Sequence, residues 1–334
     1  MAILKKLLIP LLPLVLAGCY EDFTPDIDTA PVLCLNSIIT AGEPIEVQVS
    51  RTWLFTDEAG ERNPSVPDAA VTIYANGSPV GDDYIPQEGD SIRIVADSKT
   101  YGHAEAEVVV PVSVPIAKLD WDAAVTSTWE FDYEDQLSRV YRLDVKVRMK
   151  IDDPASAVNY YQFAYEGFPE EPEYDPGISI WRPYEFWEGT FKYEVEPIFK
   201  EHIGLFESIT SADDAFGFTC FTDKQFSGQS YTLNLQFNNA RYAINGAVFE
   251  DEMADCGYEF KLYSISPSYY NWSVYRWNVD EGFISDFGDM GLGDPVWGYS
   301  NVSTGAGIVM ACSSSTYTLN LSDFLKSVIF NRQK

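Results

Sequence analysis

The chain has 334 residues, of which 46% are hydrophobic and 15% aromatic, so it is a folded protein of one large or two smaller domains and not a disordered tether. Its 51 acidic and 22 basic side chains give a formal net charge of −29. Such a surface repels nucleic-acid phosphates and anionic lipid, which excludes both as expected partners. It serves solubility outside the cell, and it favours cations or basic protein patches.

The first 18 residues have the pattern of a bacterial lipoprotein signal peptide. A short basic start precedes an apolar run, which closes in Leu16-Ala-Gly-Cys19. Cleavage before Cys19 makes this cysteine the mature N-terminus and the site of a diacylglycerol and palmitate anchor. A transmembrane helix is the alternative, but the apolar run from Leu7 to Gly18 spans only about 18 Å against a bilayer core of roughly 30 Å. We therefore expect a signal peptide over residues 1–18 and a lipid on Cys19.

Residues 19–30 form an acidic tether without periodicity. Glu21 and Asp22 directly follow the lipidation site, which resembles the surface-export signal of lipoproteins in Bacteroidota. That reading places the protein on the outer face of the outer membrane; the alternative is a solvated linker. Loss of residues 1–18 leaves 316 residues with 20 basic and 51 acidic side chains, a net charge of −31. No later segment approaches ~20 apolar residues, so we expect the lipid to be the sole anchor.

Residues 31–115 show the two-residue alternation of β-strands. Apolar residues alternate with polar ones in several short segments, namely 45–49, 71–75, 92–96 and 104–110. Asn76-Gly77 follows one of these segments and is a strong hairpin signal. Short strands at this spacing predict a β-sandwich of the immunoglobulin or fibronectin type, ended by Pro111 and Pro115.

Residues 116–334 are predicted to form a larger β-rich domain with a few helices. Alternation recurs at 141–149, 161–165, 231–237 and 258–262. A helix is expected near 266–283, because Ser266 suits an N-cap, Pro267 suits the first turn, and aromatic residues then recur at helical spacing. A shorter helix is expected over 198–207. The predicted fold class is mostly β.

Four cysteines remain once Cys19 is set aside. They are Cys34, Cys220, Cys256 and Cys312. In an exported protein they allow two disulfides in three connectivities, among which the sequence cannot choose, and a Cys220–Cys256 pair is only a guess. The segments around Cys34 and Cys312 are apolar, so these two residues also suit a buried strand. No pair has C-x-x-C spacing, so zinc is not expected.

Several short motifs follow one another along the chain. They are Pro31-Val-Leu-Cys-Leu-Asn-Ser-Ile-Ile-Thr, Ile45-Glu-Val-Gln-Val-Ser-Arg, Val66-Pro-Asp-Ala-Ala-Val-Thr-Ile-Tyr, Tyr101-Gly, Val110-Pro-Val-Ser-Val-Pro-Ile, Asp152-Asp-Pro, Asn159-Tyr-Tyr, Phe221-Thr-Asp-Lys-Gln-Phe-Ser-Gly-Gln, Tyr269-Tyr and Pro295-Val-Trp-Gly-Tyr-Ser-Asn-Val-Ser-Thr-Gly-Ala-Gly-Ile. Their order resembles that of a Bacteroidota outer-membrane lipoprotein family known only as domain of unknown function 4249. The last motif departs slightly from the family's pattern at Trp297-Gly298. The resemblance covers nearly the whole mature chain. It implies an accessory role beside TonB-dependent receptors and carries over no catalytic residue.

Catalysis has little support in the sequence. His103 and His202 are the only histidines, and no hydrolase, metalloprotease, P-loop or dinucleotide motif is present, so we expect a protein that is not an enzyme. A pair of carboxylates could hydrolyse glycosides without histidine, but no pair stands out among 51 acidic residues. Asp286, Asp289 and Asp294 lie in a glycine-rich stretch and are a weak calcium candidate.

The aromatic segment 181–193 is the best candidate for binding. Trp181, Tyr184 and Trp187 belong to six aromatic residues in thirteen, and such rings stack on sugars or anchor protein interfaces. The alternative is that these rings pack as a local core.

The leading hypothesis is a non-enzymatic lipoprotein on the outer membrane that serves as an accessory or binding subunit, with a TonB-dependent transporter or another outer-membrane protein as partner. The second hypothesis is a glycan-binding or carbohydrate-active protein that uses the aromatic segment. Adhesion or support of the envelope is a third and weaker one.

Overall fold

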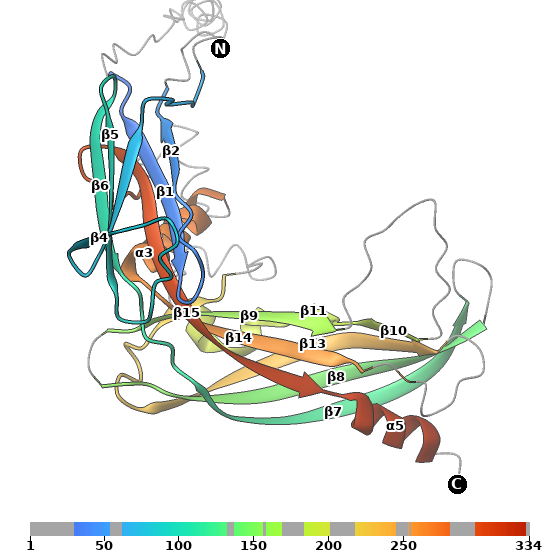
Figure 1. The fold of residues 1–334 in the computed structure, drawn as a ribbon. Coiled ribbons are helices and arrows are strands. Elements are labelled where there is room, and N and C mark those ends of the chain that lie inside the picture. Colours follow the sequence, from blue (N-terminus) through green and yellow to red (C-terminus); the bar gives the residue numbers. More distant parts are fainter. Residues whose placement is uncertain are drawn as a thin grey trace, which may run out of the picture. The chain divides into compact units, whose positions relative to one another are not determined.

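The computed structural model describes residues 30–53, 62–131, 137–155, 158–168, 184–200, 218–244, 253, 255–280 and 298–331 (Figure 1). The chain divides into two compact units, Met1–Pro31 and Val32–Lys334. Nearly all of the first unit lies outside the described residues, so the fold below is that of the second. Strands dominate it, and helices are few, which confirms the predicted mostly-β class. Within this part of the chain, no helix combines the length and the apolar character needed to cross a bilayer.

One antiparallel sheet of the sandwich has the strand order β4-β3-β5-β6. Its strands are β3 (Ala70–Ala75), β4 (Ser78–Val80), β5 (Ser91–Ser98) and β6 (Gly102–Val109). The predicted hairpin joins β3 to β4, where Asn76 and Gly77 both have positive φ, at 51° and 80°. Asp90 holds this turn in place, because its carboxylate accepts hydrogen bonds from the Asn76 amide at 2.8 Å and the Tyr84 hydroxyl at 2.6 Å.

A six-stranded sheet, ordered β12-β9-β14-β15-β1-β2, supplies the facing layer. Its strands are β1 (Leu33–Thr40), β2 (Gln48–Arg51), β9 (Tyr160–Phe168), β12 (Cys220–Thr222), β14 (Gly257–Ile265) and β15 (Ala306–Asn320). Alternate residues of β1, such as Leu33, Leu35 and Ile39, are buried against Ile92 and Ile94 of β5 in one hydrophobic core.

β15 connects this core to the rest of the protein. Its first half pairs in parallel with β1, from Cys34–Ala306 to Thr40–Cys312, and its second half pairs with β14. Val309 therefore lies in the core of the sandwich, whereas Leu319 lies in the larger core. The predicted boundary after residue 115 stays a prediction; the structure adds that a strand from the end of the chain helps to complete the sandwich.

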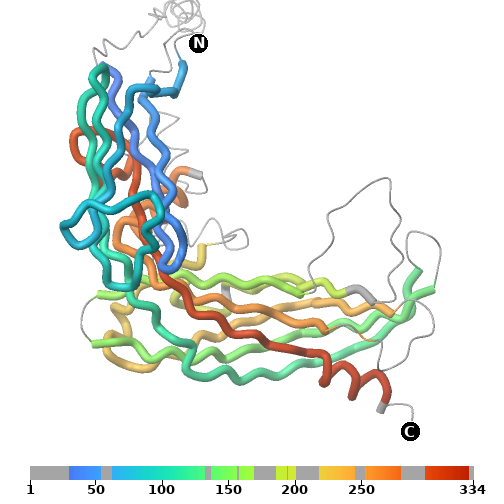
Figure 2. Tube along the Cα trace, in the orientation of Figure 1, coloured from blue at the N-terminus to red at the C-terminus, as the bar shows by residue number. Residues whose placement is uncertain are grey.

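A second layered arrangement surrounds the larger core (Figures 1 and 2). The sheet β10-β13-β8-β7, with β11 also paired to β13, faces β9, β14 and the second half of β15. Its strands are β7 (Ile116–Phe131), β8 (Leu137–Asp152), β10 (Tyr184–Trp187), β11 (Thr190–Phe191) and β13 (Ser230–Ile244). The alternation predicted at 141–149 is seen in β8, which buries Leu143, Val145 and Met149 and turns the charged residues between them outward.

Aromatic rings fill much of this core. Phe237 contacts Phe191, Tyr258 and Phe260, with ring centroids 5.1, 4.5 and 5.9 Å apart. Each such ring buries roughly 150–250 Å². The core therefore derives its stability largely from contacts between strands that are distant in the sequence.

The helices lie at the ends of strands. α3 (Pro267–Asp280) falls within the predicted range, and the Ser266 hydroxyl accepts a hydrogen bond from the Tyr269 amide at 3.2 Å, as an N-cap does. α5 (Ser322–Asn331) follows β15 and packs Phe324 edge-on against Trp121 of β7. Of the shorter helix expected over 198–207, the described residues hold a 3-10 turn, η2 (Pro197–Lys200), next to another, η1 (Tyr193–Val195).

The four cysteines of the described residues form no disulfides. All four are free thiols: Cys34, Cys220, Cys256 and Cys312. The guessed Cys220–Cys256 pair is wrong because Cys220 lies opposite Gln162 at one end of β9, whereas Cys256 adjoins the partner of Phe168 at the other end. Six residues along a strand correspond to about 20 Å, and a disulfide needs a Cα separation of roughly 4–7 Å.

Candidate functional site

Several predicted site residues lie outside the described part of the chain. These are Cys19, Trp181, Asp286, Asp289 and Asp294, together with His202. Their predicted roles in lipidation, ligand binding and calcium binding stay predictions. Among the described residues, no group of three or more histidine, cysteine or acidic side chains is arranged to hold a metal ion.

The aromatic segment is partly a core element. Phe186 and Phe191 are buried in the larger core, as the alternative interpretation expected. Trp187 is half-buried, and the Arg241 guanidinium stacks on its ring at 4.5 Å from the centroid. For Tyr184 the structure describes only the backbone, which pairs with Ile244 in β13. Two described rings of the segment are thus not fully buried, Trp187 and Tyr193, and Tyr193 packs against the larger core.

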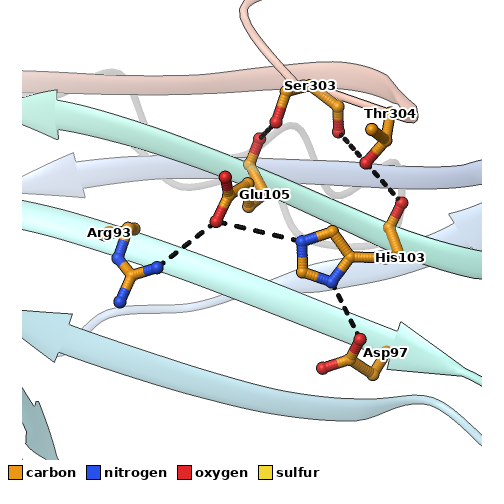
Figure 3. Close-up of polar contacts among 6 residues, drawn as sticks. All are labelled: Arg93, Asp97, His103, Glu105, Ser303 and Thr304. Carbon is orange, nitrogen blue, oxygen red and sulfur yellow. Dashed lines mark hydrogen bonds and ion pairs between the residues drawn. The ribbon is translucent and has the colours of Figure 1, made fainter.

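His103 lies in a polar cluster on the surface of β5 and β6 (Figure 3). Its Nδ1 is 2.8 Å from the Asp97 carboxylate, and its Nε2 is 3.8 Å from Glu105. Glu105 in turn pairs with Arg93 at 3.3 Å. The imidazole is therefore held between two carboxylates.

The two hydroxyl groups near His103 do not form a catalytic triad with it (Figure 3). Ser303 donates to the backbone carbonyl of Glu105 at 3.1 Å, and Thr304 donates to that of His103 at 2.8 Å. A nucleophile would need its hydroxyl within hydrogen-bond reach of the ring nitrogen. These contacts instead fasten β6 to the segment that precedes β15, where Glu105 and Ser303 also form a β-bridge.

A buried polar network joins the end of β8, the start of β9 and the turn after β12. Asp153 accepts hydrogen bonds from the Tyr161 hydroxyl, from the Asn159 amide at 3.1 Å and from the Gly228 N–H at 2.8 Å. The Asn159 amide also reaches Asp223 at 3.4 Å, and Asp223 is only 1% exposed. Burial, together with the neighbouring Asp153 and Asp223 carboxylates, raises the pKa of Tyr161.

This network was not predicted from the sequence, although its members come from three of the motifs that carry the family resemblance, Asp152-Asp-Pro, Asn159-Tyr-Tyr and residues 221–229. Buried hydrogen-bonded networks fix one arrangement of the segments that supply them. Because its carboxylates are enclosed, we assign the network a structural role.

A groove of about 540 Å³ lies beside this network. Valines and prolines, most of them from residues 109–115, make up about half of its lining, and Asp152, Asn159 and Ser264 are among its polar residues. Tyr160 is the one aromatic residue in its lining, so the groove offers little surface for stacking a sugar ring.

The end of the β7–β8 hairpin exposes large apolar side chains. Trp129, Phe131 and Leu137 are 64%, 72% and 50% exposed, and the two aromatic rings are the most exposed ones in the described chain. Phe131 lies opposite Leu137, and Trp129 lies opposite Arg139, whose guanidinium is 5.9 Å from the Trp129 ring centroid. These residues were missed because alternation in a strand reveals an apolar face but not whether that face is covered.

Comparison with known proteins gives one match. A family model described as domain of unknown function (DUF4249) matches residues 20–318. No curated protein and no solved structure matches the chain.

Proposed function

Because this chain belongs to the DUF4249 family, we propose that it is a non-enzymatic accessory or binding subunit. In this proposal a lipid on Cys19 holds the protein to the outer membrane, and the protein faces the cell surface. The partner that the family resemblance implies is a TonB-dependent transporter. The observation that carries the proposal is the sequence Leu16-Ala-Gly-Cys19, followed by a short acidic tether and then a folded body.

The tether limits where this body can be. β1 begins at Leu33, and about 14 residues separate it from Cys19. A fully extended chain spans at most ~3.3–3.6 Å per residue, so Leu33, where the folded unit begins, stays within roughly 50 Å of Cys19. A body held this close suits work beside a protein embedded in the same membrane.

A contact role suits the described surface better than catalysis does. The hydroxyls nearest to His103 are engaged by backbone carbonyls, and the buried carboxylates Asp153 and Asp223 are enclosed. The hairpin end, in contrast, offers apolar side chains for contact with another molecule.

Labelling with a palmitate analogue in the native cells tests the anchor. We expect the full-length protein to take up the label and to sediment with membranes, and Cys19→Ala to lose both properties. Cys34→Ala is the matched control, because Cys34 is half-buried in β1 and its loss leaves Cys19 intact. Unlabelled, soluble wild-type protein would refute the anchor, and a lipoprotein that always emerges alone after gentle detergent extraction would count against the accessory role.

The second candidate, a glycan-binding or carbohydrate-active protein, rests on the half-buried Trp187 ring and its Arg241 neighbour. Screening the purified protein against a glycan panel addresses it. Retention that Trp187→Ala removes would support this candidate, whereas no retention and no released sugar would exclude it.

A further inference from the structure

We propose that β7 (Ile116–Phe131) is the site at which two copies of this chain associate, edge to edge and antiparallel, with Ala124 of one copy opposite Ala124 of the other. The two sheets then continue as one across the contact. This inference goes beyond the accessory role proposed above and does not rest on it.

β7 is the one long edge strand in the described sheets. It ends the order β10-β13-β8-β7, and its partner among the described strands is β8. The other edge strands are short: β2, β4, β10, β11 and β12 have two to four residues and β6 has eight, whereas β7 has 16. β6 is also partly covered, through the β-bridge between Glu105 and Ser303. Short edge strands are one means by which proteins prevent their sheets from joining, and β7 lacks this protection.

The outer edge of β7 presents backbone groups for pairing. In an antiparallel ladder every second residue directs its N–H and C=O away from the neighbouring strand, so about seven residues of β7 direct theirs outward. Within the described chain, no hydrogen bond outside the sheet uses a β7 backbone group. After Lys118 the strand contains no lysine, proline or register shift, which are features that commonly block an edge. Two such edges would form about 14 hydrogen bonds, against about 10 in a typical protein interface.

The sequence of β7 complements itself in one antiparallel register. Residues that lie opposite one another in an antiparallel pair share a face of the sheet. With Ala124 as the centre, the two strands overlap from Ala117 to Phe131. The pairs that involve charged residues, each formed twice because of the two-fold symmetry, are Lys118–Glu130, Asp120–Thr128 and Asp122–Thr126.

The neighbouring registers lack this complementarity. Centring the strands on Asp122 places two aspartates opposite each other, and centring them on Val125 places Asp120 opposite Glu130. Centring them on Ala123 places no charges of opposite sign opposite each other. Like charges directly opposite are destabilising, and opposite charges are stabilising, so the register proposed above is the favoured one.

The ion pairs at the two ends of β7 fit the contact. Lys118 lies 2.6 Å from Asp120, and Glu130 lies 2.5 Å from Arg142 and 3.6 Å from Arg241. Glu130 alone does not neutralise the two guanidinium groups beside it. The second copy brings the Asp120 carboxylate toward this site while its Lys118 lies opposite Glu130, so charges of opposite sign adjoin across the contact. The formal net charge of −29 is spread over the whole chain, and its effect is screened beyond about 8 Å at physiological ionic strength.

The same register covers exposed apolar side chains. On the face of β7 toward the larger core, Trp129 lies opposite Leu119 of the second copy, and Phe131 lies opposite Ala117. Trp129 and Phe131 are 64% and 72% exposed in the single chain. Packing beside a second strand removes part of this surface from water, which favours association.

Disulfide crosslinking in envelopes of the native cells tests the pairing and its register. Ala124→Cys is introduced into the full-length protein, and Thr126→Cys is the matched control, because it is an exposed position on the same face of the same strand. In the proposed register the two Cα atoms at position 124 are about 4.5–5.5 Å apart, within reach of a disulfide, whereas those at position 126 are about 14 Å apart. After brief oxidation we expect Ala124→Cys to give a disulfide-linked dimer with at least about tenfold the yield of Thr126→Cys. Asp122→Cys and Thr126→Cys chains produced together should also crosslink, since these positions lie opposite each other.

A charge reversal tests the complementarity. Lys118→Glu in the Ala124→Cys protein should lower the dimer yield about tenfold, because both symmetric pairs change from attraction to repulsion. Lys146→Glu makes the same charge change at an exposed position of β8, away from the edge, and should leave the yield unchanged.

Four outcomes would overturn the proposal: no dimer from position 124, equal yields from positions 124 and 126, an adduct with a different protein instead of a second copy, or no effect of Lys118→Glu. Purified Cys19→Ala/Ala124→Cys protein separates the pairing from the anchor. A dimer there supports the pairing whether or not Cys19 is lipidated, and a labelled, membrane-bound protein that gives no dimer refutes the pairing alone.

Discussion

Replacing Ser266 by alanine should destabilise the protein more than the loss of an ordinary helix cap. Ser266 is fully buried, and its hydroxyl oxygen accepts hydrogen bonds from the backbone N–H groups of Tyr269 at 3.2 Å and Ala311 at 3.1 Å. It also contacts the Ser268 hydroxyl at 2.9 Å. Loss of an N-cap costs about 1 kcal/mol, and a buried N–H left without a partner costs a further ~1–3 kcal/mol. We therefore expect Ser266→Ala to lower the free energy of unfolding by about 2–4 kcal/mol.

Thermal unfolding of the soluble chain without residues 1–19 measures this effect. With an unfolding entropy of about 2 cal/mol/K per residue, the predicted loss lowers the melting temperature by roughly 3–6 °C. Ser327→Ala is the matched control, since Ser327 is an exposed helical serine in α5 that donates to the Phe324 carbonyl, and we expect it to change stability by less than ~0.5 kcal/mol. If the two variants unfold at the same temperature, the reasoning that Ser266 joins α3 to β15 is refuted.

Three further predictions concern single positions. Hydrogen bonds from a tyrosine hydroxyl, a backbone N–H and an asparagine amide lower the pKa of Asp90. The ionised Asp90 side chain therefore stabilises the fold above the ordinary Asp pKa of about 3.9, and this stabilisation is lost as the pH falls through the lower pKa of the folded state. Asp90→Asn should therefore lower the melting temperature at pH 7, and a deficit that persists at about pH 2 would contradict this. Gly307→Ala would place a Cβ 2.3 Å from a β1 carbonyl oxygen at a residue with φ +104°, so we expect urea unfolding to show that the free energy of unfolding falls by at least ~2 kcal/mol. Gly77→Ala has φ +80° and open space around the new Cβ, so we expect a fall of only about 1 kcal/mol. Equal falls for the two variants would exclude a clash at Gly307. Burial raises the pKa of Cys220 and Cys256 to about 12. In the Cys19→Ala protein at pH 8, we therefore expect a thiol reagent to label these two cysteines only after unfolding. Rapid labelling of both cysteines in the native protein would contradict this prediction.

Local features of the fold could be predicted from the sequence because they depend on neighbouring residues. The Asn76-Gly77 turn, the Ser266 cap and the two-residue period of β8 each follow from backbone preferences over a few positions. The parallel pairing of β1 with β15 could not, since it joins Cys34 to Ala306, and no local pattern specifies a partner so distant.

The same limit applies to the candidate site. The sequence marks 181–193 as aromatic, but the structure buries Phe186 and Phe191 in the core. It leaves Trp129 and Phe131 exposed, although their strand shows the same kind of alternation. Which apolar face is covered depends on how the sheets stack, and that information is not local.

The native size of the protein shows whether it works as a membrane-attached subunit that contacts a partner. Envelopes of the native cells are solubilised in a gentle detergent, and the full-length protein is followed on a native gel beside a Trp129→Ala/Phe131→Ala double variant. We expect a discrete wild-type species that is larger than one chain with its detergent, and we expect the double variant to return to the size of the single chain. Wild-type protein that migrates as a single chain would contradict it.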